Sequence, residues 1–343
     1  MPAGRWRRFL NRYRAAFVLL LFAPAIPELL TGSTPVSNLF FDPGQFALSF
    51  TIDVGLYGTG ALLIREFAVA YRKGWASILL LGAAYGIGEE GFAVHTFFQP
   101  SGSPVLALAT YGHAYGVNWL WALGLTVFHA TYSIALPILL VGLWFPEARG
   151  QRWFGRGGVA GLAAIYLFVV VLFAHLVGHG PSPPIFALFL GIALALIAAA
   201  CFVPTDLLSV RTGPPRAGRA GLVLAGTLGF VAWVVVLLIA SGLRLPAAGT
   251  AAVFVLIDLG ALAYVLRNVG SVDLERSELD FATGMLGALF VWDILVEFSD
   301  PGILLVAAIF GYLQYRLAAR VAARRTPGTM PVPPGTTLTP PRA

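Results

Sequence analysis

The stretch Gly82-Ala-Ala-Tyr-Gly-Ile-Gly-Glu-Glu-Gly-Phe-Ala-Val-His95 places two adjacent carboxylates and a histidine inside an apolar run that extends from Trp75 to Phe98. The length of this run is close to the roughly 20 residues that a membrane-spanning helix needs. An ionisable side chain inside a bilayer costs at least about 2.5 kcal/mol. Glu89 and Glu90 therefore need a hydrogen-bonding partner, a proton or a bound cation.

The composition is typical of an integral membrane protein. Hydrophobic residues make up 58% and charged residues 11% of the 343 positions, and the mean hydropathy is +0.82. Soluble chains carry roughly 25% charged residues. The alternating pattern of an outer-membrane barrel is absent, so we predict an all-α, polytopic helix bundle. The single cysteine, Cys201, excludes an intrachain disulfide.

Ten apolar segments are predicted to span the membrane. We expect a basic N-terminal segment at residues 1–14, a transmembrane domain at 15–315 and a disordered Pro/Thr-rich tail at 316–343. The predicted spans are 15–30, 46–64, 75–98, 117–144, 158–177, 184–203, 221–243, 249–266, 281–297 and 301–315. The break at Ser299-Asp-Pro-Gly302 leaves open whether the last two spans cross completely.

The distribution of basic residues predicts the orientation. If the N-terminus is cytoplasmic, all of the 22 lysines and arginines except Arg244 fall in cytoplasmic segments. The positive-inside rule therefore places both termini in the cytoplasm of a multi-pass cell (plasma) membrane protein. This placement also explains the net charge of +6 by attraction to the lipid bilayer, and nucleic acid is not needed as a partner. The substrate and the oligomeric state stay open.

The ionisable residues within the spans are predicted to lie in the extracytoplasmic half of the membrane. By helical rise, Glu90 is roughly 10 Å and His129 about 12–15 Å from the outer interface. Asp53, Asp258 and Asp293 lie roughly 10–13 Å deep by the same count. No lysine or arginine falls within a predicted span, so these acids have no basic partner there. We expect them to line one outward-facing cavity.

Helical geometry suggests which side chains meet. Glu89 and Glu90 share a face with Gly82 and Gly86, whose spacing lets a neighbouring helix approach closely. His129, on the next predicted span, is the first candidate partner of the acidic pair.

A second pair of histidines has the spacing of metal ligands. His175 and His179 are four residues apart on one helix face, which lets two imidazoles bind one divalent metal such as zinc.

The order of Glu89-Glu90, then His129, then His175-xxx-His179 resembles the CAAX-protease and bacteriocin-processing (Abi) family of intramembrane proteases. That resemblance implies a Glu89 or Glu90 base that activates water, assisted by His129 and His175. Val94, Leu125 and His179 stand where the family has Arg, Phe and Asn or Asp. The blocks Tyr85-Gly-Ile-Gly-Glu-Glu-Gly91 and Asn118-Trp-Leu-Trp121 also look like segments of uncharacterised prokaryotic multi-pass proteins.

Three functions fit these residues. A membrane-embedded hydrolase would use Glu89, Glu90 and His129 as catalytic residues, with or without a metal at His175 and His179. A proton- or cation-coupled transporter would use the embedded acids as ion sites and His129 as a relay. A non-catalytic assembly subunit would use the acids only for packing. The histidines favour the first function, and the unpaired acids on several helices favour the second.

Overall fold

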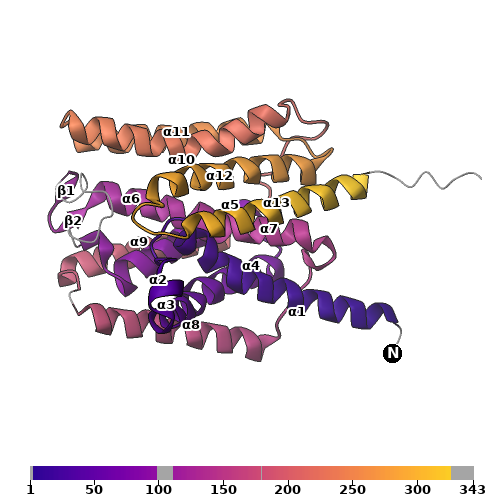
Figure 1. Cartoon of the computed structure of the whole chain (residues 1–343), viewed down its shortest axis with the longest axis horizontal. Helices are drawn as coiled ribbons and strands as arrows, with labels where there is room; N and C mark the ends of the chain where they lie inside the picture. Colours follow the sequence, from indigo (N-terminus) through magenta and orange to yellow (C-terminus); the bar gives the residue numbers. More distant parts are fainter. Residues whose placement is uncertain (1–2, 99–110, 179, 326–343) are drawn as a thin grey trace, which may run out of the picture.

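The computed structural model describes residues 3–98, 111–178 and 180–325 as an all-α helix bundle. Most of the long helices run along one common direction, and both ends of the described chain lie at the same end of the bundle (Figure 1). We call this the terminal end. A short antiparallel ribbon of β1 (His113–Ala114) and β2 (Val117–Asn118) lies at the opposite end.

The N-terminal half of the bundle is built from helices that are interrupted by short irregular turns. The elements are α1 (Ala3–Pro24), η1 (Ala25–Leu29), α2 (Asn38–Phe41), α3 (Pro43–Asp53), η2 (Val54–Gly58), α4 (Thr59–Ala70), α5 (Trp75–Gly86), η3 (Ile87–Ala93), η4 (Thr96–Phe98), α6 (Trp119–Phe128), η7 (His129–Ala135), α7 (Leu136–Trp144) and η8 (Pro146–Ala148).

Long, uninterrupted helices form the rest of the bundle. They are α8 (Arg156–Val177), α9 (Pro183–Phe202), α10 (Arg219–Gly242), α11 (Ala247–Asn268), α12 (Leu274–Val296) and α13 (Ile303–Arg325). In the view of Figure 1, α8 and α11 form opposite edges of the bundle. Both carry exposed apolar side chains, such as Phe168 on α8 and Leu256 on α11. Such surfaces suit contact with lipid.

The sequence explains several helix ends. The side chain of Asp42 accepts a hydrogen bond from the backbone N–H of Gln45 at 3.0 Å, and Asn118 does the same for Trp121 at 3.1 Å. These contacts satisfy backbone donors that the first helical turn leaves unpaired. At the other end of a helix, Gly178 adopts a left-handed conformation with φ of 72° and ends α8.

Eight helices in the described ranges are long and apolar enough to cross a membrane. They include α3–η2–α4 and α6–η7–α7, each as one continuous helix, and the six helices from α8 to α13. The predicted spans at 15–30 and 75–98 correspond to α1–η1 and α5–η3, which pack inside the bundle. The count of ten spans stays a prediction.

Helices extend past the predicted domain boundaries at both ends. The first helix already begins at Ala3, within the segment predicted as a basic N-terminus. The last helix continues to Arg325, so residues 316–325 are helical rather than part of a disordered tail. The remainder of the predicted tail lies outside the described residues.

A buried ion pair corrects the prediction that no basic residue lies within a span. Helix α4 runs past the predicted boundary at residue 64, and Arg65 and Glu66 are both buried in it. Arg65 pairs with Glu66 and donates to the carbonyl groups of Ala148 and Arg149, each at 2.9 Å. Glu66 in turn accepts the backbone N–H of Trp153 at 2.9 Å. This pair fastens the loop before α8 to α4.

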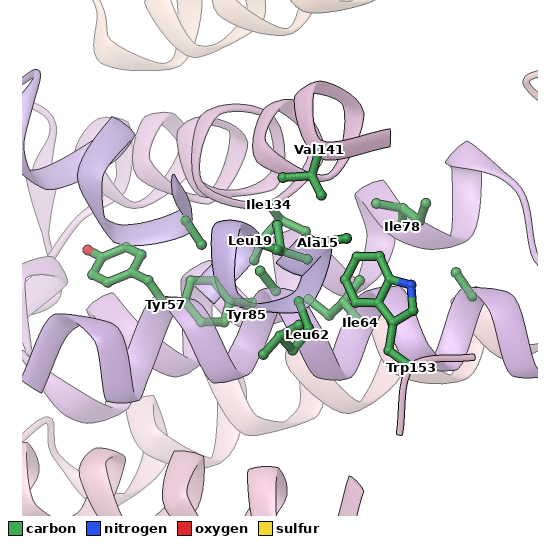
Figure 2. Packing of buried hydrophobic residues seen from close by; sticks show 14 of the residues in the cluster. Ala15, Leu19, Tyr57, Leu62, Ile64, Ile78, Tyr85, Ile134, Val141 and Trp153 are labelled. Carbon is green, nitrogen blue, oxygen red and sulfur yellow. The ribbon is translucent and has the colours of Figure 1, made fainter. Parts of the chain in front are cut away.

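Apolar side chains from α1, α4, α5 and α7 form one core cluster. Figure 2 shows Tyr57 and Tyr85 at one end of this cluster and Trp153 at the other. Leu19, Leu62 and Ile134 fill its centre and are almost completely buried. Burial of this kind is the main contribution that side-chain packing makes to holding the helices together in lipid.

Glycines allow α10 and α12 to cross in close contact. A Cβ atom at Gly226 would lie 2.4 Å from the carbonyl oxygen of Phe281, and one at Gly284 would lie 2.0 Å from that of Val223. Any larger residue at these positions would force the helices apart.

Gly284→Ala should therefore destabilise the bundle by about 1–3 kcal/mol, because the added methyl group overlaps backbone atoms of α10. The matched control is Gly287→Ala on the same helix, where a Cβ would meet no atom within 4 Å. The control should melt at the same temperature as the wild type or higher. Thermal unfolding of the detergent-solubilised protein, followed by size-exclusion peak loss, makes the comparison. Equal melting temperatures for the two variants would contradict the close helix crossing.

Candidate functional site: a buried Glu–His–Tyr network

The candidate site is carried by π-helical turns. Each of the four π-helical segments in the described ranges contributes at least one of its residues: Glu28 on η1, Tyr57 on η2, Glu89 and Glu90 on η3, and His129 on η7. Isolated π turns within α-helices are uncommon and occur frequently at functional sites. One physical cause is visible in η1, where Pro27 lacks the N–H that a regular helix would use. The widened turns redirect side chains toward one point.

His129 lies between the two adjacent acids. Its Nε2 atom is 2.9 Å from Oε1 of Glu90, and its Nδ1 atom is 3.0 Å from Oε2 of Glu89. The Nδ1 atom is also 2.9 Å from the hydroxyl of Ser133, one turn further along η7. All four residues are buried, with His129 only 2% exposed. Both ring nitrogens therefore face proton donors or acceptors.

Small residues on α5 make this approach possible. A Cβ atom at Gly82 would lie 2.8 Å from Cα of Ala130, and one at Gly86 would lie 2.9 Å from Cβ of His129. The close helix approach expected from the Gly82 and Gly86 spacing is thus present, and it holds the imidazole against the acidic pair.

Hydrogen bonds extend the network from Glu89 through two hydroxyl groups. The Tyr57 hydroxyl lies within hydrogen-bond distance of both Glu89 and Glu28. The Thr34 hydroxyl lies 3.0 Å from Oε2 of Glu28 and 2.8 Å from Oδ2 of Asp53. Asp53, Thr34 and Tyr57 are buried and Glu28 is half-buried.

On its other side, the network ends at an aromatic side chain. The Thr96 hydroxyl donates to Oε2 of Glu90, and Nε1 of Trp121 donates to the Thr96 oxygen at 3.3 Å. The connected groups therefore run in the order Asp53, Thr34, Glu28, Tyr57, Glu89, His129, Glu90, Thr96 and Trp121.

The number of hydrogens in this network constrains the charge of its acids. Each of the two hydroxyl groups has one hydrogen, yet each lies between two carboxyl oxygens. The other two contacts must use hydrogens supplied by the carboxyl groups themselves. At least two protons are therefore shared among Asp53, Glu28 and Glu89 when all four hydrogen bonds are made.

The acids in this network have no basic partner apart from His129. Among the described residues, no salt bridge joins a lysine or arginine to Glu28, Asp53, Glu89 or Glu90. A buried charge without compensation is very costly. Shared protons, the imidazolium form of His129 or a bound cation must neutralise the cluster.

The same three residues could hold a metal ion. One ligand atom from each of Glu89, Glu90 and His129 can be chosen so that all three lie within 4.8 Å of one another. This is the one such group of three or more acids, histidines or cysteines in the part of the chain that the structure describes.

The other predicted site residues lie elsewhere. His175 is exposed on α8 and His179 lies outside the described residues, so the predicted metal pair stays a prediction. Asp258 is half-buried on α11, and Asp293 is fully buried on α12. No hydrogen bond within the described ranges joins Asp258 or Asp293 to the network, and a cavity shared by all three aspartates with Glu90 stays a prediction.

Sequence reasoning missed the hydroxyl groups that connect the acids. Tyr57 follows Asp53 by four residues and so belongs to the same helix face, a spacing that could have suggested it. Thr34 lies in the connection between η1 and α2, where no periodic pattern points to it.

Comparison with known proteins places the chain in a family. Residues 17–323 match an uncharacterized membrane protein family, which covers most of the chain. The protein therefore belongs to this family of multi-pass membrane proteins. No curated protein and no solved structure matches the chain.

Tyr57→Phe should destabilise the protein by roughly 1–3 kcal/mol, because it removes the hydroxyl group between the carboxyl groups of Glu89 and Glu28. Tyr85→Phe is the matched control: Tyr85 is also buried, but its hydroxyl oxygen has no hydrogen-bond partner in the described structure. The control should melt at the wild-type temperature or above. Thermal unfolding in detergent checks both, and an unchanged Tyr57→Phe melting temperature would count against the bridging role.

Proposed function

We propose that this protein moves protons, as a proton-coupled membrane transporter whose proton pathway is the Asp53–Glu90 network. The observation that carries the proposal is the unbroken series of proton donors and acceptors that connects both acids of the pair to Glu28 and Asp53. Chains of Asp, Glu and His within a membrane domain are typical of proton relays.

The geometry suggests how a proton would pass. Glu90 transfers a proton to Nε2 of His129, and the Nδ1 hydrogen of the same ring leaves to Oε2 of Glu89. Glu89 then gives a proton to the Tyr57 oxygen while the Tyr57 hydroxyl hydrogen moves to Glu28. The Thr34 hydroxyl passes a proton from Glu28 to Asp53 in the same manner. One proton enters and one leaves, and rotation of the hydroxyl groups, the carboxyl groups of Glu89 and Glu28 and the ring restores the starting state.

The burial of the network also favours proton transfer over a purely structural role. A packing contact between helices needs no ionisable groups, and apolar residues of similar volume stabilise such contacts as well or better. Here acids and a histidine from four separate segments meet at one place, and each segment carries a π turn.

Proteoliposomes that contain a trapped pH-sensitive dye should show proton flux when a potassium gradient and valinomycin impose a membrane potential. Glu89→Gln should lower this flux by at least about tenfold, because the amide cannot pass a proton from His129 to Tyr57. Asp258→Asn removes a membrane carboxyl group outside the network and should leave the flux unchanged.

Two results would contradict the proton pathway. One is an equal flux in wild type and Glu89→Gln. The other is stoichiometric zinc in the purified wild-type protein that is lost in both Glu90→Gln and His129→Ala, which would assign the cluster to metal binding instead.

That second result would support a membrane-embedded hydrolase, the alternative that the mutual distance of the three candidate ligands favours. The resemblance to CAAX and bacteriocin-processing proteases implies a base at Glu89 or Glu90 assisted by His129, and the close approach of these side chains supports this alternative. In that function a metal held by these three side chains would activate water. The exposed position of His175 on α8 gives this alternative less support than the relay.

We further propose that the terminal end of the bundle faces the cytoplasm, as the distribution of arginines predicts. In a Cys201→Ser background, Tyr115→Cys at the ribbon end should react with a membrane-impermeant thiol reagent added to intact cells. Arg152→Cys, in the loop at the terminal end, should react only after the cells are opened. Both positions are exposed. The reverse labelling pattern would overturn this orientation.

A further inference from the structure

A pocket of about 400 Å³ opens at the terminal end of the bundle, away from the Glu–His–Tyr network. Its walls come from α1, α4, α5 and α7, from the connection between α4 and α5, and from the loop between α7 and α8. Four of the lining residues are basic, namely Arg65, Arg72, Lys73 and Arg149, and none is acidic.

Two of these bases are neutralised by acids and two are not. Arg65 pairs with the buried Glu66, and Arg149 makes two hydrogen bonds to Glu278 at 2.7 and 2.9 Å. Arg72 and Lys73 form no salt bridge with any acid in the described ranges. The pocket therefore has a net positive charge that protein carboxylates do not compensate.

The two uncompensated bases differ in how they are held. Lys73 donates to the carbonyl groups of Cys201 and Val203 at the end of α9. Arg72 adopts a left-handed conformation with φ of 52°, directly after the end of α4, and its side chain is exposed. No salt bridge from its guanidinium group to an acid occurs within residues 3–98, 111–178 and 180–325, so this group can bind an anion.

The rest of the pocket is apolar and aromatic. Leu19, Ile78 and Ile138 line it, together with the indole rings of Trp75 and Trp153. The Trp153 ring is itself fixed, because the Arg65 guanidinium lies 3.5 Å from its centre. Basic groups beside apolar walls, with tryptophans between them, suit a molecule that has an anionic head and a hydrocarbon tail.

We propose that this pocket binds the phosphate group of an anionic phospholipid, with Arg72 and Lys73 as the main phosphate contacts and the apolar wall against the start of an acyl chain. Free phosphate offers the same charge but would leave the apolar wall unused. The position of the pocket at one end of the spanning helices places it at the depth of lipid headgroups.

Native mass spectrometry of the detergent-solubilised protein, titrated with phosphatidylglycerol or phosphatidylcholine, tests this assignment. Wild type should retain phosphatidylglycerol in preference to phosphatidylcholine. Arg72→Asn should weaken phosphatidylglycerol binding by about fivefold, the effect expected for one basic contact. Asparagine tolerates the left-handed backbone, so the variant should fold. Arg72→Lys should retain most of the binding.

The matched control is Arg267→Gln, which removes an exposed positive charge at the end of α11, outside the pocket lining. It should bind phosphatidylglycerol as the wild type does. Equal retention of the two lipids, or equal loss of binding in Arg72→Asn and Arg267→Gln, would overturn the proposal. Displacement of phosphatidylglycerol by millimolar inorganic phosphate would overturn the assignment to lipid and identify the pocket as a site for free phosphate.

Discussion

The contact of His129 with both Glu89 and Glu90 is the interaction on which the core of this bundle depends. Two adjacent acids inside a membrane domain are very costly when uncompensated, and no lysine or arginine reaches them in the described structure. A single imidazole contacts both acids because each of its nitrogens faces a different carboxyl group. This requires α5 and η7 to lie closer than side chains normally allow, and Gly82 and Gly86 provide the space.

The same constraint explains why the helices around the site are irregular. In a regular α-helix, neighbouring side chains such as Glu89 and Glu90 point in different directions. A π turn changes the direction of the side chains that follow it, so residues of several segments can meet at one place. Each π turn in the described ranges supplies part of the network. Two hydroxyl groups then join acids that would otherwise repel one another, and shared protons lower the charge of the whole group.

The network and the pocket at the terminal end have opposite imbalances of charged residues. In the network, acids outnumber bases, so protons or a bound cation must neutralise the negative charge of the acids. In the pocket at the terminal end, Glu66 and Glu278 pair with Arg65 and Arg149, whereas Arg72 and Lys73 form no salt bridge in the described structure, so bases are in excess there. The apolar cluster between Tyr57 and Trp153 separates these regions and keeps both in fixed positions (Figure 2). Membership of an uncharacterized membrane protein family agrees with this architecture.

Hydropathy by itself was enough to predict an all-α membrane bundle, because the cost of placing each segment in lipid depends on local composition. It also marked Glu89, Glu90 and His129, since ionisable groups in apolar runs stand out. The spacing of Gly82 and Gly86 predicted a close helix approach, but which groups meet also depends on helix rotation and π turns, which residue spacing alone does not determine. Only the tertiary structure therefore shows that Tyr57 and Thr34 lie between the acids, that these contacts join Asp53 to Glu90, and that Arg65 is buried against Glu66.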